Sequence, residues 1–159
     1  AVGCMRTAVS ADIKARRDVS AGVFVGAGGL VGPLEVPVVL GLGVLTWVAG
    51  FDVIYACQDA EIDRRLGLRS LPARWGVRRA LAVAAGLHVV CVLCFAALGP
   101  LADLDGPWNA AVAFVGVLLL VEHLLVRPDD LSRVNLAFFT LNGIVSLVLG
   151  GTGILDVLL

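Results

Sequence analysis

Three aspartates and a tyrosine follow a long apolar run in the first half of the chain: Asp52, Tyr55, Asp59 and Asp63. At about 100° per residue, an ideal helix places these carboxylates within a few tens of degrees of one face, with Tyr55 one turn before Asp59. Acidic side chains at the end of a membrane helix are costly unless they are paired or bind a metal. Carboxylate oxygens suit Mg²⁺, which commonly bridges them to substrate phosphates. The cluster therefore predicts a metal–diphosphate site at a membrane boundary.

An arginine-rich stretch follows the acidic cluster. Its six arginines are Arg64, Arg65, Arg69, Arg74, Arg78 and Arg79. Membrane topology alone accounts for some of them, because basic loops stay in the cytosol. Guanidinium groups also bind phosphate in a bidentate manner, so contact with a diphosphate by Arg65 or Arg69 is an equal alternative. Gly67 and Pro72 should interrupt the helix and allow this loop to fold back over the site.

The composition places these residues in a bilayer. The chain is 59% hydrophobic and its mean hydropathy is +0.97, against roughly 45–50% apolar residues in soluble domains. Four apolar segments approach the 20 or so residues needed to cross a membrane. They are residues 34–54, 80–98, 110–126 and 136–155. The net charge of −1 leaves no dominant basic surface, so we expect no nucleic-acid partner. The sequence predicts an all-α, polytopic transmembrane helix bundle.

The charges of the connecting loops predict the orientation of the bundle. The first loop (residues 55–79) and the third (127–135) contain arginines, whereas the second (99–109) contains only Asp103 and Asp105 as charged residues. Basic loops face the cytosol, so the first and third loops, and with them the aspartate cluster, should be cytosolic.

The amino-terminal residues fit this plan less well. Residues 19–32 are glycine-rich but too short to span at 1.5 Å per residue. We expect residues 1–32 to be an irregular or damaged segment and residues 33–159 to form the membrane domain. The glycines at 26, 28, 29 and 32 depart from a dinucleotide fingerprint in spacing and context, and close helix packing explains them better.

Two further groups of polar residues have simpler interpretations. His88, Cys91 and Cys94 recur every third residue, but a structural zinc site needs four ligands and no second cysteine pair is suitably spaced. We therefore interpret the cysteines as small buried hydrophobes and His88 as a residue that bonds between helices or lines a cavity. In the third loop, mutual pairing of arginines with aspartates and an N-cap from Asp130 or Ser132 are expected.

The cluster and the loop together resemble a known family. The pattern Asp-x-x-Tyr-x-x-x-Asp-x-x-x-Asp, followed by Gly67, Arg69, Ser70 and Gly76, resembles the second aspartate motif of the UbiA prenyltransferases. Residues 122–143 also resemble the 4-hydroxybenzoate polyprenyltransferase branch, which serves ubiquinone and menaquinone biosynthesis. The resemblance extends over residues 34–157.

The resemblance implies a nine-helix membrane enzyme of the bacterial inner membrane, of which this chain has four to five spans. Such an enzyme transfers a polyprenyl group from a polyprenyl diphosphate, held through Mg²⁺, to an aromatic acid such as 4-hydroxybenzoate. The resemblance assigns roles as follows: metal binding to Asp52, Asp59 and Asp63, catalysis to Tyr55, and substrate binding to Arg65, Arg69 and Ser70. Tyr55 would orient a carboxylate or line the cavity near the allylic cation.

One part of the family pattern is missing. The first motif, Asn-Asp-x-x-Asp-x-x-x-Asp, does not occur in the sequence, so half of the metal ligands are absent. We expect the isolated chain to be inactive, with a separate amino-terminal half as its candidate partner. A cation-transporter fragment and a non-catalytic membrane remnant are the alternatives. A transporter should place acidic residues deep within its spans, whereas Glu35 and Glu122 lie near expected helix ends.

Overall fold

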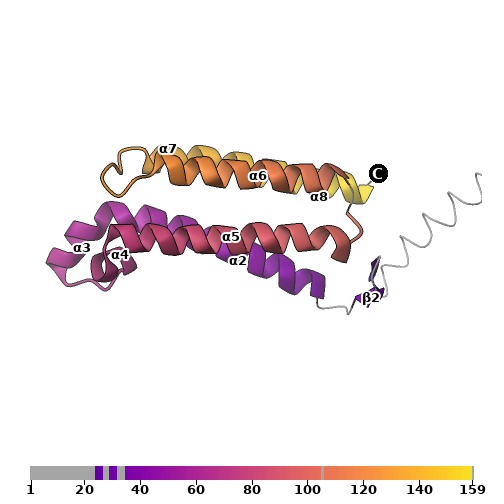
Figure 1. The fold of residues 1–159 in the computed structure, drawn as a ribbon, viewed down its shortest axis with the longest axis horizontal. Helices are drawn as coiled ribbons and strands as arrows, with labels where there is room; N and C mark the ends of the chain where they lie inside the picture. The colour runs from indigo at the N-terminus through magenta and orange to yellow at the C-terminus, as the bar shows by residue number, and fades with distance from the viewer. Residues whose placement is uncertain (1–23, 27–28, 32–34, 105, 159) are drawn as a thin grey trace, which may run out of the picture.

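The computed structural model describes residues 24–26, 29–31, 35–104 and 106–158 (Figure 1). Most of the segment that we expected to be irregular, residues 1–32, lies outside the described residues. Its described part is a short antiparallel hairpin of β1 (Phe24–Gly26) and β2 (Gly29–Val31), in which Phe24 pairs with Val31.

The rest of the described chain is helical, as the sequence predicted. The elements are α2 (Glu35–Ala56), a 3-10 turn (Cys57–Asp59), α3 (Ala60–Leu66), α4 (Leu71–Trp75), α5 (Val77–Leu101), α6 (Gly106–Leu125), α7 (Val134–Leu136), a π-helical turn (Ala137–Leu141) and α8 (Asn142–Leu158). Three helical segments are long and apolar enough to cross a membrane: Glu35–Leu66, Val77–Leu101 and Gly106–Leu125. The fourth expected span, residues 136–155, lies within the helical run that α7, the π-helical turn and α8 form together from Val134 to Leu158.

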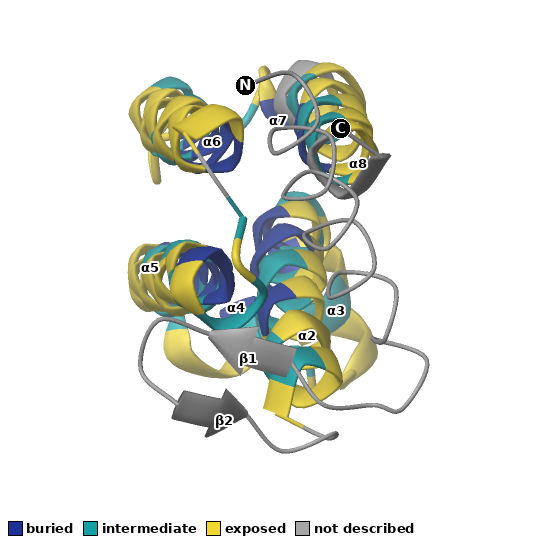
Figure 2. Ribbon diagram, turned by 90° about the vertical axis from the view of Figure 1, so that its right-hand side faces the viewer, coloured by how far each residue is buried: buried dark blue, intermediate teal, exposed yellow. Residues whose placement is uncertain are grey.

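The helices form two layers that lie side by side. One layer pairs α2 with α5, the other pairs α6 with α8, and α5 also contacts α6 (Figures 1 and 2). Buried residues gather where the helices face one another, and the outward faces are exposed and apolar (Figure 2). An exposed apolar surface of this extent suits contact with lipid.

Small residues on α2 allow it to approach α5 closely. A Cβ atom on Gly43 would lie 2.8 Å from Cε1 of Phe95, and a Cβ atom on Gly50 would overlap the His88 ring. The two glycines are seven residues apart and therefore lie on the same face of α2. This spacing brings the backbone of α2 against side chains of α5, as in other closely packed membrane helices.

The core is anchored by aromatic side chains. Phe51, Phe95 and Trp108 are buried in one cluster, and Trp108 Nε1 donates a hydrogen bond of 2.9 Å to the Phe95 carbonyl oxygen. This bond satisfies the indole N–H, which would otherwise be costly to bury. Because α5 and α6 contribute one partner each, it also fixes their relative position.

Two loops that are far apart in sequence meet at one end of the bundle. Gln58 Nε2 donates to Asn135 Oδ1 at 3.3 Å, which joins the first loop to the third. The connection between α5 and α6 lies at the opposite end (Figure 1). The arginine-rich loops therefore share one end and Asp103 lies at the other, which is the arrangement that their charges predicted.

Candidate functional site

A cavity of about 270 Å³ lies between α2 and α8. Its lining residues are Trp47, Val48, Phe51, Asp52, Asn142, Gly143 and Ser146. Four of these come from one face of α2, since positions i, i+1, i+4 and i+5 of a helix are neighbours. The cavity is thus apolar along most of α2, with one carboxylate, one amide and one hydroxyl.

The start of α8 gives the opposite wall its polar groups. Asn142 is the first residue of α8 and directly follows the π-helical turn, and Ser146 lies one turn later. Single turns of π-helix occur frequently at functional sites, because the wider turn redirects the side chains around it. Asn142 and Ser146 both line the cavity.

The three aspartates follow one another along the same helical segment, Glu35–Leu66. Asp52 lines the cavity and is exposed, whereas Asp59 is exposed and Asp63 half-buried, and neither is among the residues that line it. The 3-10 turn at Cys57–Asp59 lies in this segment, and an ideal 3-10 helix advances about 120° per residue instead of about 100°. Over its three residues it rotates Asp59 and Asp63 by roughly 60° relative to Asp52. The helical segment continues through Asp63 to Leu66, and the predicted break at Gly67 is confirmed by its left-handed φ of 70°.

Tyr55 lies on α2, one turn after Asp52, and is 41% exposed. The preceding residue, Ile54, is buried in the core. The lining of the described cavity does not include Tyr55. Its catalytic role therefore stays a prediction.

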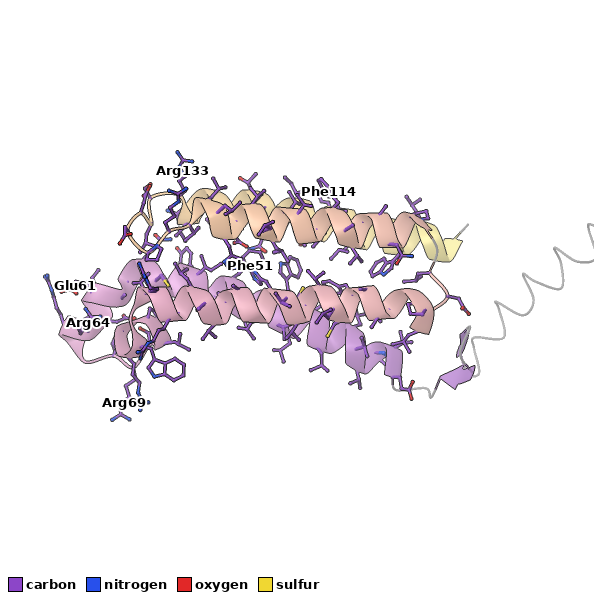
Figure 3. All side chains as sticks on the ribbon, viewed as in Figure 1. Phe51, Glu61, Arg64, Arg69, Phe114 and Arg133 are labelled. Atoms are coloured by element: carbon purple, nitrogen blue, oxygen red, sulfur yellow. The ribbon has the colours of Figure 1, made fainter. Side chains whose placement is uncertain are left out.

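The residues expected to bind substrate contact their own neighbours. Arg64 and Arg65 both bind Glu61, at 2.9 and 3.1 Å, and all three side chains are exposed. Glu61 and Arg64 lie at the end of the bundle, and Arg69 extends away from the helices (Figure 3). These exposed ion pairs are weak, so they leave the arginines available to a stronger anionic partner.

Ser70 has a structural role in the loop. Its Oγ accepts a hydrogen bond from the Ala73 amide at 3.3 Å and caps α4. A serine cap satisfies one of the backbone amides that the first helical turn leaves unpaired. A contact between Ser70 and a substrate stays a prediction.

The third loop is organised by Asp130. Its Oδ1 accepts hydrogen bonds from the hydroxyl and the amide of Ser132, at 2.6 and 3.0 Å. These two bonds lower the pKa of the Asp130 carboxyl below its ordinary range, and the charges of Arg133 and Arg127 act in the same direction. Asp130 thus stabilises the turn that precedes α7 rather than capping a helix directly.

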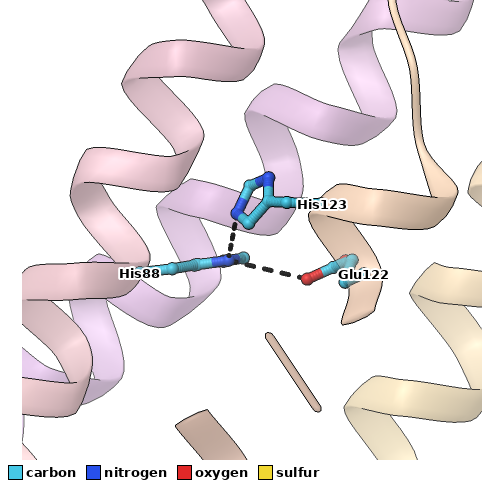
Figure 4. A group of neighbouring side chains, drawn as sticks. All are labelled: His88, Glu122 and His123. Atoms are coloured by element: carbon cyan, nitrogen blue, oxygen red, sulfur yellow. Dashed lines mark hydrogen bonds and ion pairs between the residues drawn. The ribbon is translucent and has the colours of Figure 1, made fainter. Parts of the chain in front are cut away.

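A second polar group, which we did not predict, is buried inside the bundle. His88 on α5 meets Glu122 and His123 on α6 (Figure 4). The His88 Nδ1 atom lies 3.1 Å from His123 Nε2 and 3.5 Å from Glu122 Oε2. Each of the three side chains offers one atom that could bind a metal, and these three atoms all lie within 4.8 Å of one another.

His88 also connects this group to the cavity wall. Its Nε2 lies 3.3 Å from the Trp47 carbonyl oxygen, and its ring packs edge-on against Phe51 with centroids 4.8 Å apart. This confirms the expectation that His88 bonds between helices. Cys91 and Cys94 are free thiols, and Cys91 is fully buried as a small hydrophobe.

The comparisons with known proteins agree with this arrangement. The UbiA prenyltransferase family matches residues 19–144. A solved apo structure of a UbiA homolog from Aeropyrum pernix K1 is similar, with a TM-score of 0.63 and 32% sequence identity. The similarity covers 72% of this chain but 40% of that chain, so this chain spans well under half of the relative's length. A comparison with curated proteins found no match. On the family match over most of its length, the chain belongs to the UbiA prenyltransferase family.

Proposed function

We propose that this chain supplies the carboxyl-terminal half of an aromatic prenyltransferase. The reaction is transfer of a polyprenyl group from a polyprenyl diphosphate to an aromatic acid such as 4-hydroxybenzoate, in quinone biosynthesis at a bacterial inner membrane. The observation that supports it most directly is the cavity between α2 and α8, where a carboxylate adjoins an otherwise mostly apolar wall. A polyprenyl diphosphate has the same two parts, a hydrocarbon chain and an anionic head.

The apolar part of the wall would hold the prenyl chain. Trp47, Val48 and Phe51 present apolar surface to the cavity on α2. The cavity volume of about 270 Å³ lies just under the range of roughly 300–1,000 Å³ for small-molecule sites. We infer that further helices enlarge it in the assembled enzyme, as the partial coverage of the solved relative suggests.

The aspartates are suitable ligands for Mg²⁺. Mg²⁺ in proteins keeps several waters and binds one or two carboxylates together with substrate phosphates, so it does not require a tight cage. Asp52 at the cavity, with Asp59 and Asp63 further along the same helical segment, offers carboxylates in that manner. The metal, when bound, would stabilise the negative charge that develops on the departing diphosphate.

The other residues of the loop would act on the same head group. Arg65 and Arg69 lie at the end of the bundle that holds the aspartates, where their charge would attract the diphosphate. Arg65 would exchange its exposed pairing with Glu61 for the more strongly charged phosphate. Tyr55 would orient a carboxylate or stand near the allylic cation, and this end of the bundle would face the cytosol.

The experiment restores the part of the site that the chain lacks. The chain is expressed alone, and also together with an amino-terminal half of a family member that bears the first aspartate motif. Membranes are then supplied with farnesyl diphosphate and 4-hydroxybenzoate, with and without Mg²⁺, and the product is measured by mass spectrometry. We expect product from the pair with Mg²⁺ and none from the chain alone.

Substitutions then test the role of the aspartates. Asp52→Ala or Asp59→Ala should lower transfer by the pair by on the order of a hundredfold or more, as for other losses of transition-state charge stabilisation. Asp103→Asn is the matched control, because this exposed carboxylate lies at the opposite end of the bundle. Transfer by the isolated chain would refute the need for a second half, and a pair indifferent to both alanine substitutions would refute the assigned metal site.

A further inference from the structure

The buried group of His88, Glu122 and His123 has an unusual balance of charges and hydrogen bonds. Glu122 is 0% exposed and His88 is 2% exposed, within helices that are long and apolar enough to cross a membrane. Neither carboxylate oxygen of Glu122 has a hydrogen-bond partner in the described part of the structure. A buried carboxylate without a donor is costly, and inside a membrane the cost is larger still.

The hydrogen bonds of His88 determine which of its nitrogens can bind a ligand. Its Nε2 faces the Trp47 carbonyl oxygen, which can only accept, so Nε2 carries the hydrogen. In a neutral imidazole the Nδ1 atom then has a free lone pair, and this atom is the one that faces His123 and Glu122. Metal-binding histidines commonly donate their other ring N–H to a carbonyl oxygen in this manner.

In their neutral forms the two histidines can satisfy each other, but they leave an ionised Glu122 without a donor. A hydrogen on His123 Nε2 could be donated to His88 Nδ1 across the 3.1 Å that separates them. Both of these nitrogens are then used, and the two Glu122 oxygens still lack a donor. A cation bound by all three side chains would accept a lone pair from each histidine and would also balance the charge of the Glu122 carboxylate.

The two distances from His88 fit the coordination shell of a small transition metal, and all three ligand atoms lie within 4.8 Å of one another. With bonds of about 2.0–2.1 Å, the ligand atoms of a tetrahedral Zn²⁺ site lie roughly 3.3–3.4 Å from one another. The separations of 3.1 Å between the histidine nitrogens and 3.5 Å between Nδ1 and Oε2 bracket that value. Two imidazoles and one carboxylate are also a ligand set that Zn²⁺ uses, with its fourth position open, whereas Mg²⁺ prefers oxygen ligands alone.

From this geometry we propose that His88, Glu122 and His123 bind a divalent transition metal, Zn²⁺ in the first place, inside the helix bundle. The site is separate from the aspartates expected to hold Mg²⁺, because it lies between α5 and α6, behind the wall that Trp47 and Phe51 give to the cavity. It joins two helices through their side chains and positions the His88 ring against α2.

The test measures metal in the purified chain. The chain is purified in detergent through a tag that contains no histidine, loaded with Zn²⁺, freed of excess metal, and analysed by elemental mass spectrometry. We expect about one Zn²⁺ per chain, and a rise in the thermal unfolding temperature on adding Zn²⁺. Glu122→Gln keeps the shape of the side chain and should remove most of the bound metal and the rise.

Two matched controls exclude other ligands. Asp52→Asn removes the carboxylate at the cavity, and Cys94→Ser removes a half-buried thiol on α5, and both should keep the metal. If Zn²⁺ stays in Glu122→Gln, or is lost from Asp52→Asn instead, the assignment is wrong. Absence of bound Zn²⁺ in the unmodified chain would also overturn it and would favour a charged His88–Glu122 pair.

A second measurement uses the unmodified chain, so its result does not depend on whether a variant folds. Co²⁺ is added to the unmodified chain as a spectroscopic substitute for Zn²⁺, and visible absorption is recorded. Nitrogen and oxygen ligands at an open four- or five-coordinate site should give d–d bands without the intense charge-transfer band of a thiolate. A thiolate band would place the metal on the cysteines, and a spectrum of hydrated Co²⁺ would show that the group binds no metal.

Discussion

Replacing Gly50 with alanine tests how closely α2 and α5 pack around the buried histidine. The added Cβ would overlap the His88 ring and would lie 3.3 Å from the Ala84 carbonyl oxygen. The carbonyl belongs to the backbone of α5 and cannot move alone. The ring could rotate, but it contacts the Trp47 carbonyl oxygen, His123 and Phe51 in its present position. Gly50→Ala must therefore displace the ring or separate the helices.

The expected cost follows from these contacts. Overpacking of a core costs about 1–3 kcal/mol. Rotation of the ring would also lose two hydrogen bonds, each contributing about 1 kcal/mol. Alanine recovers about 1 kcal/mol through its better helix propensity. The balance is a loss of about 2–4 kcal/mol in the free energy of unfolding, which is a large fraction of the stability of a domain.

Gly41→Ala is the matched control for this experiment. Gly41 lies on the same helix, but no heavy atom lies within 4 Å of the position that its Cβ would take. The control should therefore gain about 0.5–1 kcal/mol, from helix propensity alone. Both variants are unfolded with a denaturing detergent in the presence of a chelator, and helix content is followed by circular dichroism. Equal stability of the two variants would refute the close packing of α2 against His88.

Two further outcomes concern the loops at the arginine-rich end. Ser70→Ala should destabilise α4 by about 1 kcal/mol and speed hydrogen exchange of the Ala73 amide, whereas Ser70→Thr should keep the cap; unchanged exchange in the alanine variant would contradict the capping role. The hydrogen bonds from Ser132 lower the pKa of Asp130 in the folded chain, so their contribution is complete above the ordinary aspartate pKa and is lost as the pH falls through the lowered value. An NMR titration of the Ser132 amide should have its midpoint below the ordinary aspartate range and should be flat in Asp130→Asn, and a midpoint at the ordinary value would contradict this.

The fold was predictable because it depends on long runs of simple chemistry. Apolar segments of membrane-spanning length predicted the helices. Glycine at position 67 predicted the end of α3, and the structure shows why: the φ of 70° there disfavours residues with a side chain. The charges of the loops also predicted which connections share an end. The fourth segment was predicted as a full span because its sequence stays apolar from residue 136 onward. Helices α7 and α8 and the π-helical turn between them do cover this segment, and no composition signal marks the π-helical turn at Ala137–Leu141.

The site was less predictable, because side-chain convergence depends on small changes of backbone. We placed Asp52, Asp59 and Asp63 on one face by assuming an ideal α-helix. The 3-10 turn at Cys57–Asp59 changes the ideal helical phase between Asp52 and Asp63 by roughly 60°. Such a turn differs from an α-helical turn by one hydrogen-bond step, and tertiary packing decides between them.

Glu122 shows the opposite failure. It lies three residues before the end of α6, so its sequence position suggested an exposed helix end, and we used that position against a transporter. In the structure it is fully buried, because the long helix α5 runs past it and presents His88 at the same level. Nearness to a helix end in sequence therefore says little about burial when the neighbouring helix is longer. The group of His88, Glu122 and His123 can be recognised only when it is known that α5 packs against α6.

Helix α2 connects the two candidate sites through only a few atoms. Trp47 and Phe51 line the cavity and also contact the His88 ring, Trp47 through its carbonyl oxygen and Phe51 through its own ring. A shift of that ring should therefore move the cavity wall, whereas Glu122 contacts the ring and does not itself line the cavity. Gly50→Ala should consequently disturb both sites, while Glu122→Gln, which keeps its shape, should leave the wall near its present position. If the assembled enzyme loses transfer in Gly50→Ala but keeps it in Glu122→Gln, the position of the His88 ring supports the cavity independently of any metal behind it. Equal loss in both variants would instead mean that the buried group must be intact for α2 to hold its place.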